Sequence, residues 1–363
     1  MPEPPQPSVH LPDIDTDPLQ FQVVRAQDYD NPNNVTLCGE SDFYNSTTLP
    51  YSFNNNKWGD DGSGFSCLSV LDQGSSFSVS FQWKGDASTV KGFPYMKLDP
   101  ERLPTQLWNV STLQFSGKWS TLVEGTEDQS PEEQAVAYDN VGLKTNAAID
   151  MFLSDDATNS TGLGAPIEIM IWLWYVPAII PLGYTESTPD IDTVEVGGTS
   201  FSLYHGWNAQ GQNVFSWLPQ QNLTSTNDDF SPLLTYIWKK GLLSGALYLG
   251  QVEFGTEVMH AGLTTTFQAS DYELKLYREG DEDDPNPKTT STTSTTASAT
   301  STSSSKTSTV LGTTPTAQAP AESSSSAAAA GTPVFSISQK LCIALPTVIS
   351  ILSGAFMLMS VTT

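Results

Sequence analysis

The sequence is poor in basic residues: of its 363 residues, 15 are Lys or Arg and 40 are Asp or Glu, so the formal net charge is −25. Such an acidic chain repels phosphate backbones, which argues against nucleic acid as a partner. Histidine is also scarce, and none of the three His residues has the surroundings of a Ser-His-Asp triad. Clusters of His and Cys with metal-ligand spacing are missing, so we expect no metal and no cofactor.

Cysteine is equally rare, with Cys38, Cys67 and Cys342 as the three examples. Cys342 lies in an apolar C-terminal run, which leaves Cys38 and Cys67 as a natural pair. The chain also contains Asn-x-Ser/Thr sequons at Asn34, Asn45, Asn109, Asn159 and Asn222. Five sequons, a disulfide and a Ser/Thr-rich tail together favour the secretory route and a glycoprotein.

The N-terminus lacks the basic and apolar segments of a signal peptide. Either a leader is missing from this sequence or its start is misassigned; the independent features downstream still favour a secreted or cell-surface protein. Residues 1–20 are rich in Pro and Asp, and we expect them to be disordered.

The C-terminal run 341–361 contains no charge, and no basic flank follows it. Small residues, a spacer and an uncharged tail are typical of a GPI-attachment signal, and an ordinary tail anchor is the alternative. We therefore predict a folded domain over residues 21–279. An acidic and then Ser/Thr/Ala-rich linker follows over 280–331, and the GPI signal or tail anchor over 332–363.

Short alternating runs dominate the predicted domain, for example residues 77–83 (FSVSFQW) and 201–204 (FSLY). Strict alternation between turn-forming clusters predicts antiparallel strands with one face on a core. One helix stands out, with Ser231 as N-cap, Pro232 at the first helical position and Gly241 as C-cap. The fold class is therefore all-β, a two-sheet antiparallel jelly roll or sandwich with one late helix.

Residues 167–174 (IEIMIWLW) carry a single charge. On a strand, the aliphatic residues at 167, 169, 171 and 173 form one face, whereas Glu168, Met170, Trp172 and Trp174 form the other. One interpretation is a fully buried strand in which Glu168 is an edge residue. The other is the floor of a cleft that stacks sugar rings beside a catalytic carboxylate.

Two further acids occur in strand-like contexts: Asp150 in residues 146–152 (NAAIDMF), and Glu257 at the end of 254–257 (FGTE). Because charged groups in apolar strands are costly unless they are paired, three of them indicate a shared site. Carboxylates beside aromatic residues are typical of glycosidases.

Five segments stand out when the chain is taken in order: residues 55–59 (NNKWG), 62–67 (GSGFSC), 90–94 (VKGFP), 168–172 (EIMIW) and 254–257 (FGTE). In these segments and in their order, the sequence resembles glycoside hydrolase family 12, the endoglucanases and xyloglucan-specific endoglucanases with a β-jelly-roll fold. The resemblance spans roughly residues 38–276.

This resemblance implies a role for each matching residue. Glu168 matches the nucleophile, Glu257 the general acid/base, and Asp150 the residue that supports the nucleophile. Trp58, Asn56, Met170 and Trp172 match the substrate-binding residues, and Cys38 and Cys67 match a disulfide. The implied activity is that of a retaining endo-β-1,4-glucanase, with a cellulose-like glucan or xyloglucan as its polysaccharide partner. The C-terminal run, independently of the resemblance, predicts attachment to the membrane through a lipid anchor, and we expect a monomer.

Some residues depart from the family pattern: Lys57, Tyr95, Glu253 and Val258 stand where Leu, Asn, Gln and Pro are usual. Glu253 would face the same cleft as Glu257 and raise the pKa of the acid/base. These departures keep open a catalytically inactive, cell-surface carbohydrate-binding jelly roll. A transglycosylase, in which a sugar replaces water as acceptor, is a further alternative.

Overall fold

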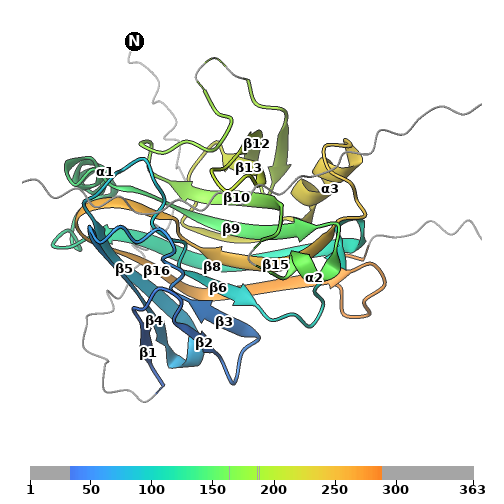
Figure 1. The fold of residues 1–363 in the computed structure, drawn as a ribbon, viewed down its shortest axis with the longest axis horizontal. Helices are drawn as coiled ribbons and strands as arrows, with labels where there is room; N and C mark the ends of the chain where they lie inside the picture. Colours follow the sequence, from blue (N-terminus) through green and yellow to red (C-terminus); the bar gives the residue numbers. More distant parts are fainter. Residues whose placement is uncertain (1–32, 163, 186, 188, 288–363) are drawn as a thin grey trace, which may run out of the picture. The chain divides into compact units, whose positions relative to one another are not determined.

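The computed structural model describes residues 33–162, 164–185, 187 and 189–287. The predicted N-terminal segment, most of the predicted linker and the C-terminal signal lie outside these residues. The described chain is mostly antiparallel β-structure, which confirms the predicted all-β jelly-roll class (Figure 1). None of its helices is long and apolar enough to cross a membrane.

The strands form two sheets. Sheet A contains, in spatial order, β1 (Val35–Leu37), β4 (Gly64–Leu71), β5 (Ser76–Trp83), β16 (Val258–Arg278), β8 (Val110–Val123) and β14 (Ser225–Asp229). Every neighbouring pair in sheet A is antiparallel.

Sheet B positions the candidate site. It contains, in spatial order, β2 (Phe43–Asn45), β3 (Tyr51–Asn54), β6 (Tyr95–Leu98), β15 (Tyr248–Gly255), β9 (Lys144–Ser154), β10 (Ile167–Tyr175), β13 (Asn213–Pro219), β12 (Thr199–Trp207) and β11 (Thr193–Val196). The short strand β7 (Thr105–Gln106) also pairs with β15. Only β10 and β13 run parallel among these pairs of the described chain.

The hydrophobic core lies between the two sheets. Phe254 of β15 contacts Phe77 of β5 and Phe115 of β8, with ring centroids 6.2 and 4.5 Å apart, respectively. All three rings are almost completely buried, and burial of one such side chain contributes about 1.5–3 kcal/mol. In β5, the predicted alternation is confirmed, since Phe77, Val79, Phe81 and Trp83 are buried and the intervening Ser and Gln residues are more exposed.

The predicted late helix is α3 (Ser231–Lys239), and its Leu233, Leu234 and Ile237 are buried as expected. The predicted N-cap is wrong by one position, because Ser231 is already helical and Phe230 precedes the helix. The side chain of Asp229 accepts the hydrogen bond from the Ser231 backbone N–H at 2.9 Å. Gly241 adopts φ +72°, the left-handed conformation expected after a helix end.

Two helices join the predicted one. In α1 (Pro131–Asn140), Ser130 and Glu133 form a capping box, a local signal that the sequence already contained. The single turn α2 (Ala157–Ser160) starts at Asp156, whose side chain accepts from the backbone N–H of Asn159. Single 3₁₀ turns cover Asp72–Gly74 and Leu107–Asn109.

Cys38 and Cys67 form a disulfide, as predicted. Of the five sequon asparagines, Asn45, Asn159 and Asn222 are exposed, and Asn34 and Asn109 are half-buried. The side-chain amide of Asn222 forms two hydrogen bonds with the backbone of Tyr175. Its oxygen accepts from the Tyr175 N–H at 3.0 Å, and its nitrogen donates to the Tyr175 carbonyl at 2.7 Å. Glycosylation at the five sequons stays a prediction.

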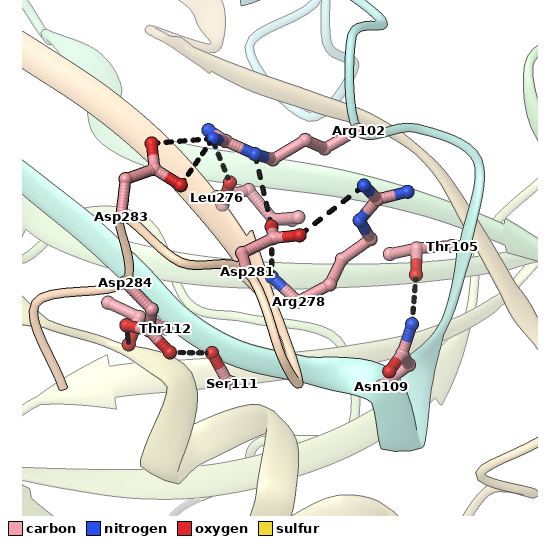
Figure 2. A network of polar contacts seen from close by, with 10 residues as sticks. All are labelled: Arg102, Thr105, Asn109, Ser111, Thr112, Leu276, Arg278, Asp281, Asp283 and Asp284. Atoms are coloured by element: carbon pink, nitrogen blue, oxygen red, sulfur yellow. Dashed lines mark hydrogen bonds and ion pairs between the residues drawn. The ribbon is translucent and has the colours of Figure 1, made fainter. Parts of the chain in front are cut away.

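Residues 279–287 follow the last strand and pack on the domain (Figure 2). Arg102 forms ion pairs with Asp281 at 3.1 Å and with Asp283 at 2.7 Å. Asp284 is buried and accepts hydrogen bonds from the hydroxyls of Ser111 and Thr112. The acidic start of the predicted linker is therefore held against β8 and β16, whereas the rest of the linker lies outside the described residues.

Candidate active site

The predicted strand 167–174 is β10, and its register brings the candidate residues together. It pairs Glu168 with Phe152, Met170 with Asp150, and Trp172 with Ala148. Residues directly opposite each other point to the same side of a sheet. Ile169 and Ile171 point to the core and are fully buried. Glu168, Met170, Trp172 and Asp150 therefore share the face of sheet B that points away from the core, which we call the outer face.

One prediction about this strand is wrong. The register between β10 and β9 shifts between Trp172 and Trp174, where a bulge inserts one extra residue. Trp174 therefore leaves the outer face and packs edge-on against Tyr138 of α1, with ring centroids 5.8 Å apart. Tyr175 replaces it on the outer face, where its ring lies 5.8 Å from that of Trp172. Strict alternation could not reveal this, because a bulge reverses the phase of every later residue.

A row of side chains, most of them ionisable, crosses the outer face at the level of Asp150. Glu253 lies directly between Asp150 on β9 and Lys97 on β6, and Met170 continues the row on β10. Asp150 and Glu253 are only 4% and 3% exposed although they point away from the core. Neighbouring side chains must therefore cover them, so this row forms the floor of the site.

Glu257 is held at one end of the site by Asn146. The Asn146 amide donates to Glu257 Oε2, and its Oδ1 accepts from the Glu257 backbone N–H at 2.9 Å. Gly255 allows this end of β15 to lie close to its neighbour, since a Cβ at that position would be 2.2 Å from the Pro94 carbonyl oxygen. Asn146 was not among the predicted site residues, although its even spacing from Asp150 predicts the same face of the strand.

Glu168 has an amide partner that no sequence pattern predicted. Asn208, in the turn between β12 and β13, donates to Glu168 Oε2 at 3.3 Å and to Gln212 Oε1 at 2.7 Å. No local signal connects residues 40 positions apart in the chain, so only the pairing of β10 with β13 identifies Asn208.

Burial dominates the electrostatics of the two candidate catalytic residues. It raises the pKa of Glu168 to about 8, and the charges of Glu257 and Glu253 add to this effect, whereas the amide of Asn208 opposes it. Burial also raises the pKa of Glu257 to about 7, and the hydrogen bond from Asn146 lowers it. The two carboxyls therefore interact and together hold one proton near neutral pH, and general-acid chemistry requires the form in which that proton is on Glu257 and Glu168 is charged.

Asp150 and Glu253 complete the carboxyl cluster. Burial raises the pKa of Asp150 well above its ordinary value, and the charges of Glu168, Glu253 and Glu257 raise it further. Its Oδ1 atom is buried without a hydrogen-bond partner among the described residues. The expectation that Glu253 acts on Glu257 is wrong: Glu253 acts on Asp150 and Glu168, because the register places it opposite Asp150.

The remaining predicted residues differ in their exposure to solvent. Trp58 is 50% exposed, so its indole can stack on a ligand. Asn56 is half-buried, and its amide donates to the Phe93 carbonyl at 3.3 Å. Met170 and Trp172 are buried, and Trp172 Nε1 has no partner among the residues that the structure describes. Lys57 pairs with Asp60 at 3.0 Å.

Across sheet B, two tyrosines lie on one side of Glu168 and Lys97 lies on the other. Tyr204 of β12 pairs with Ser216 of β13 and therefore lies on the outer face. Its ring is 5.3 Å from that of Tyr184, in the loop between β10 and β11. The outer face thus offers polar or aromatic side chains on both sides of the carboxyls. Within the described part of the chain, no group of three or more His, Cys, Asp or Glu side chains is arranged to hold a metal ion.

Comparison with known families and proteins agrees with this geometry. Residues 49–276 match the model of glycosyl hydrolase family 12. The chain is 29% identical over 246 residues to "Xyloglucan-specific endo-beta-1,4-glucanase A" of Emericella nidulans, which covers 66% of this chain and 90% of that protein. It is 26% identical over 238 residues to "Endoglucanase A" of Aspergillus kawachii, covering 63% and 88% of the two chains.

Solved structures show the same fold. Endoglucanase 3 of Trichoderma harzianum superposes with a TM-score of 0.56 at 23% identity, covering 67% of this chain and 98% of that one. A family 12 xyloglucanase from Bacillus licheniformis gives a TM-score of 0.54 at 24% identity, covering 67% and 100%.

Proposed function

The chain belongs to glycosyl hydrolase family 12, and from this premise we propose that it is a retaining endo-β-1,4-glucanase acting on a cellulose-like glucan or on xyloglucan. The observation that carries the proposal is the carboxyl cluster on the outer face of sheet B. Glu168 and Glu257 lie close enough for the charge of Glu257 to raise the pKa of Glu168, and each is held by a separate amide. Such a pair fits the two carboxyls that glycoside hydrolysis requires.

In the first step, a Glu168 carboxylate oxygen attacks the anomeric carbon and forms a glycosyl ester, while the bond to the leaving oxygen breaks. Glu257 transfers its proton to that oxygen, so the leaving chain departs as a neutral alcohol. In the second step, the Glu257 carboxylate removes a proton from water, whose oxygen attacks the same carbon and releases Glu168. The Asn146 amide is hydrogen-bonded to both the carboxylate and the backbone of Glu257. It thereby fixes the orientation of the Glu257 carboxyl in both steps.

Asp150 supports the nucleophile by remaining protonated. Its raised pKa keeps it neutral while Glu168 ionises, so Asp150 itself adds no negative charge beside the carboxylate that must attack. Asp150 is a diagonal neighbour of Glu168 across β9 and β10, because it pairs with Met170 two residues along. A neutral carboxyl at that position can donate its proton as a hydrogen bond to Glu168.

Endo-action is favoured by binding groups on both sides of the carboxyls. Lys97 and Glu253 lie toward β6, and Tyr204 lies toward β12, so a chain can extend in both directions from the bond to be cleaved. Exposed Trp58 and the indole N–H of Trp172 suit the apolar faces and hydroxyls of sugar rings. The acidic floor favours a neutral polymer over an anionic one.

Hydrolysis of xyloglucan, mixed-linkage glucan and hydroxyethylcellulose tests the proposal. Wild type should release reducing ends from the interior of at least one polymer, with a rapid fall in viscosity. Glu168→Gln should abolish this activity, whereas Glu273→Gln should retain it, because Glu273 is exposed on sheet A beside Lys275. A wild-type protein that binds these polymers without cleaving them would refute the enzyme and support the carbohydrate-binding alternative.

For the location of the enzyme, the proposal is a secreted monomeric glycoprotein held at the cell surface by a C-terminal lipid anchor. The sequons, the disulfide and the uncharged run 341–361 support it. Phosphatidylinositol-specific phospholipase C should release the activity from intact cells. Retention of the activity after this treatment would favour a spanning tail.

A further inference from the structure

Four carboxyls, rather than two, meet on the outer face, and Glu253 is the one without a role in the reaction steps. It is 3% exposed, which is unusual for a carboxyl unless it is functional or paired. The register places it directly opposite Asp150 on one side and Lys97 on the other. Side chains in such pairs have Cβ atoms about 4.5–5.5 Å apart. Glu253 is therefore the neighbour of both Asp150 and Lys97, whose ammonium donates a hydrogen bond to Gln251 Oε1 at 3.4 Å.

The partners of Glu253 differ from those of Asp150. Lys97 lies beside Glu253, and the Tyr95 hydroxyl donates a hydrogen bond to it; both interactions favour its charged form. Asp150 has a backbone hydrogen bond from Met151, and its Oδ1 is without a partner in the described chain. When this pair of buried carboxyls loses one proton, the negative charge therefore settles on Glu253 and Asp150 stays neutral.

We propose that Glu253 is a positioning residue that ionises together with Glu168, and that its charge moves the working range of the enzyme toward higher pH. Glu168 lies two strands from Glu253, a separation of about 10 Å. The groups that face the pair are Lys97 and Tyr95 from β6, Asp150 from β9, Glu257 beyond β15, and Asn208 beside Glu168. Lys97 is the only cation among them, so it determines how readily Glu253 becomes charged.

The size of the effect follows from the separation. A like charge about 10 Å away, at the effective dielectric constant of about 20 that suits buried sites, raises the pKa of Glu168 by at most about one unit, the full amount being reached when Glu253 is completely ionised. The pH optimum lies midway between the two controlling pKa values, so it should change by about half a unit. Removal of the charge from Glu253 should therefore lower the optimum.

The test uses Glu253→Gln, Lys97→Met and the double variant, with kcat/KM measured from pH 4 to pH 10 on the best neutral glucan. Glu253→Gln keeps the shape of the side chain and should lower the optimum by about half a pH unit. Lys97→Met should shift it in the same direction, because Glu253 then keeps its proton while Glu168 ionises. The double variant should show no further shift, since the charge on Glu253 is already gone.

A second measurement does not depend on activity. Burial raises the pKa of Glu253 to about 8, so wild type loses stability as pH rises from about 4.5 to about 8, while the unfolded chain ionises freely. The melting temperature of Glu253→Gln should exceed that of wild type by a margin that grows across this window.

This inference rests on the proposed function, and its failure can be distinguished from the failure of that function. If wild type is inactive on every glucan, the proposed glucanase function is refuted. An active wild type whose optimum is unchanged, or rises, in Glu253→Gln refutes the role of Glu253. Additive shifts in the double variant would show that Lys97 acts on Glu168 by another route and would also overturn the inference.

Discussion

Glu257 should lower the stability of the folded protein at neutral pH, so its replacement by Gln should remove activity and raise the melting temperature. The structure gives the reason. Burial raises the pKa of Glu257 to about 7, although Asn146 donates a hydrogen bond to it. In the unfolded chain the same carboxyl ionises at about 4.5, so rising pH favours the unfolded state between these two values.

The magnitude follows from the two pKa values. The separation between these two pKa values corresponds to about 3 kcal/mol above pH 7. Glu257 is partly exposed to solvent, which reduces this figure, and we expect about 2 kcal/mol. In the Glu257→Gln variant, the new amide side chain would still accept the hydrogen bond from Asn146 through its oxygen. For a domain of this size, about 2 kcal/mol raises the melting temperature by about 5 °C.

The assay is thermal unfolding of wild type and Glu257→Gln at pH 4, 6 and 8, followed by circular dichroism. The two proteins should melt together at pH 4, where Glu257 is protonated in both the folded and the unfolded state. The variant should melt about 5 °C higher at pH 8. Exposed Glu273→Gln is the matched control, with a small and constant difference from wild type. A gain that is equal at pH 4 and pH 8, or a loss at pH 8, would refute the reasoning.

Further predictions concern other parts of the domain. Asn146→Ala should lower kcat at least about tenfold on a soluble β-glucan, because Glu257 loses the side chain that orients it; an unchanged kcat would contradict this role. Replacement of both Cys38 and Cys67 by Ser should reduce the free energy of unfolding by about 3.5 kcal/mol in urea titrations, since the disulfide closes a loop across 29 positions. Asp284→Ala should destabilise the domain by about 1–3 kcal/mol and speed proteolysis after β16, because two buried hydroxyls lose their acceptor. Equal cleavage rates in the two proteins would show that the segment is held by other contacts.

Much of the fold could be predicted from local patterns. The alternation in residues 77–83 and the apolar stripe of α3 each depend on neighbours within one element. The capping box of α1 was equally local, and attention to Ser130 and Glu133 would have predicted that helix. The start of α3 was less predictable. The side chain of Asp229 accepts a hydrogen bond from the first residue of this helix, Ser231, and also one from the backbone of Leu113 in a distant strand.

The candidate site divides in the same way. The sequence by itself indicated Glu168, Asp150 and Glu257 as candidates, because charged residues in apolar strands stand out and because five motifs occur in the family's order. Only the tertiary structure decided their partners. The bulge moved Trp174 out of the site, the pairing of β10 with β13 brought in Asn208, and the register set Glu253 against Asp150. Strand pairing joins residues far apart in the chain, and the pKa of a buried carboxyl depends on those neighbours, so the charge of the site is a property of the folded sheet.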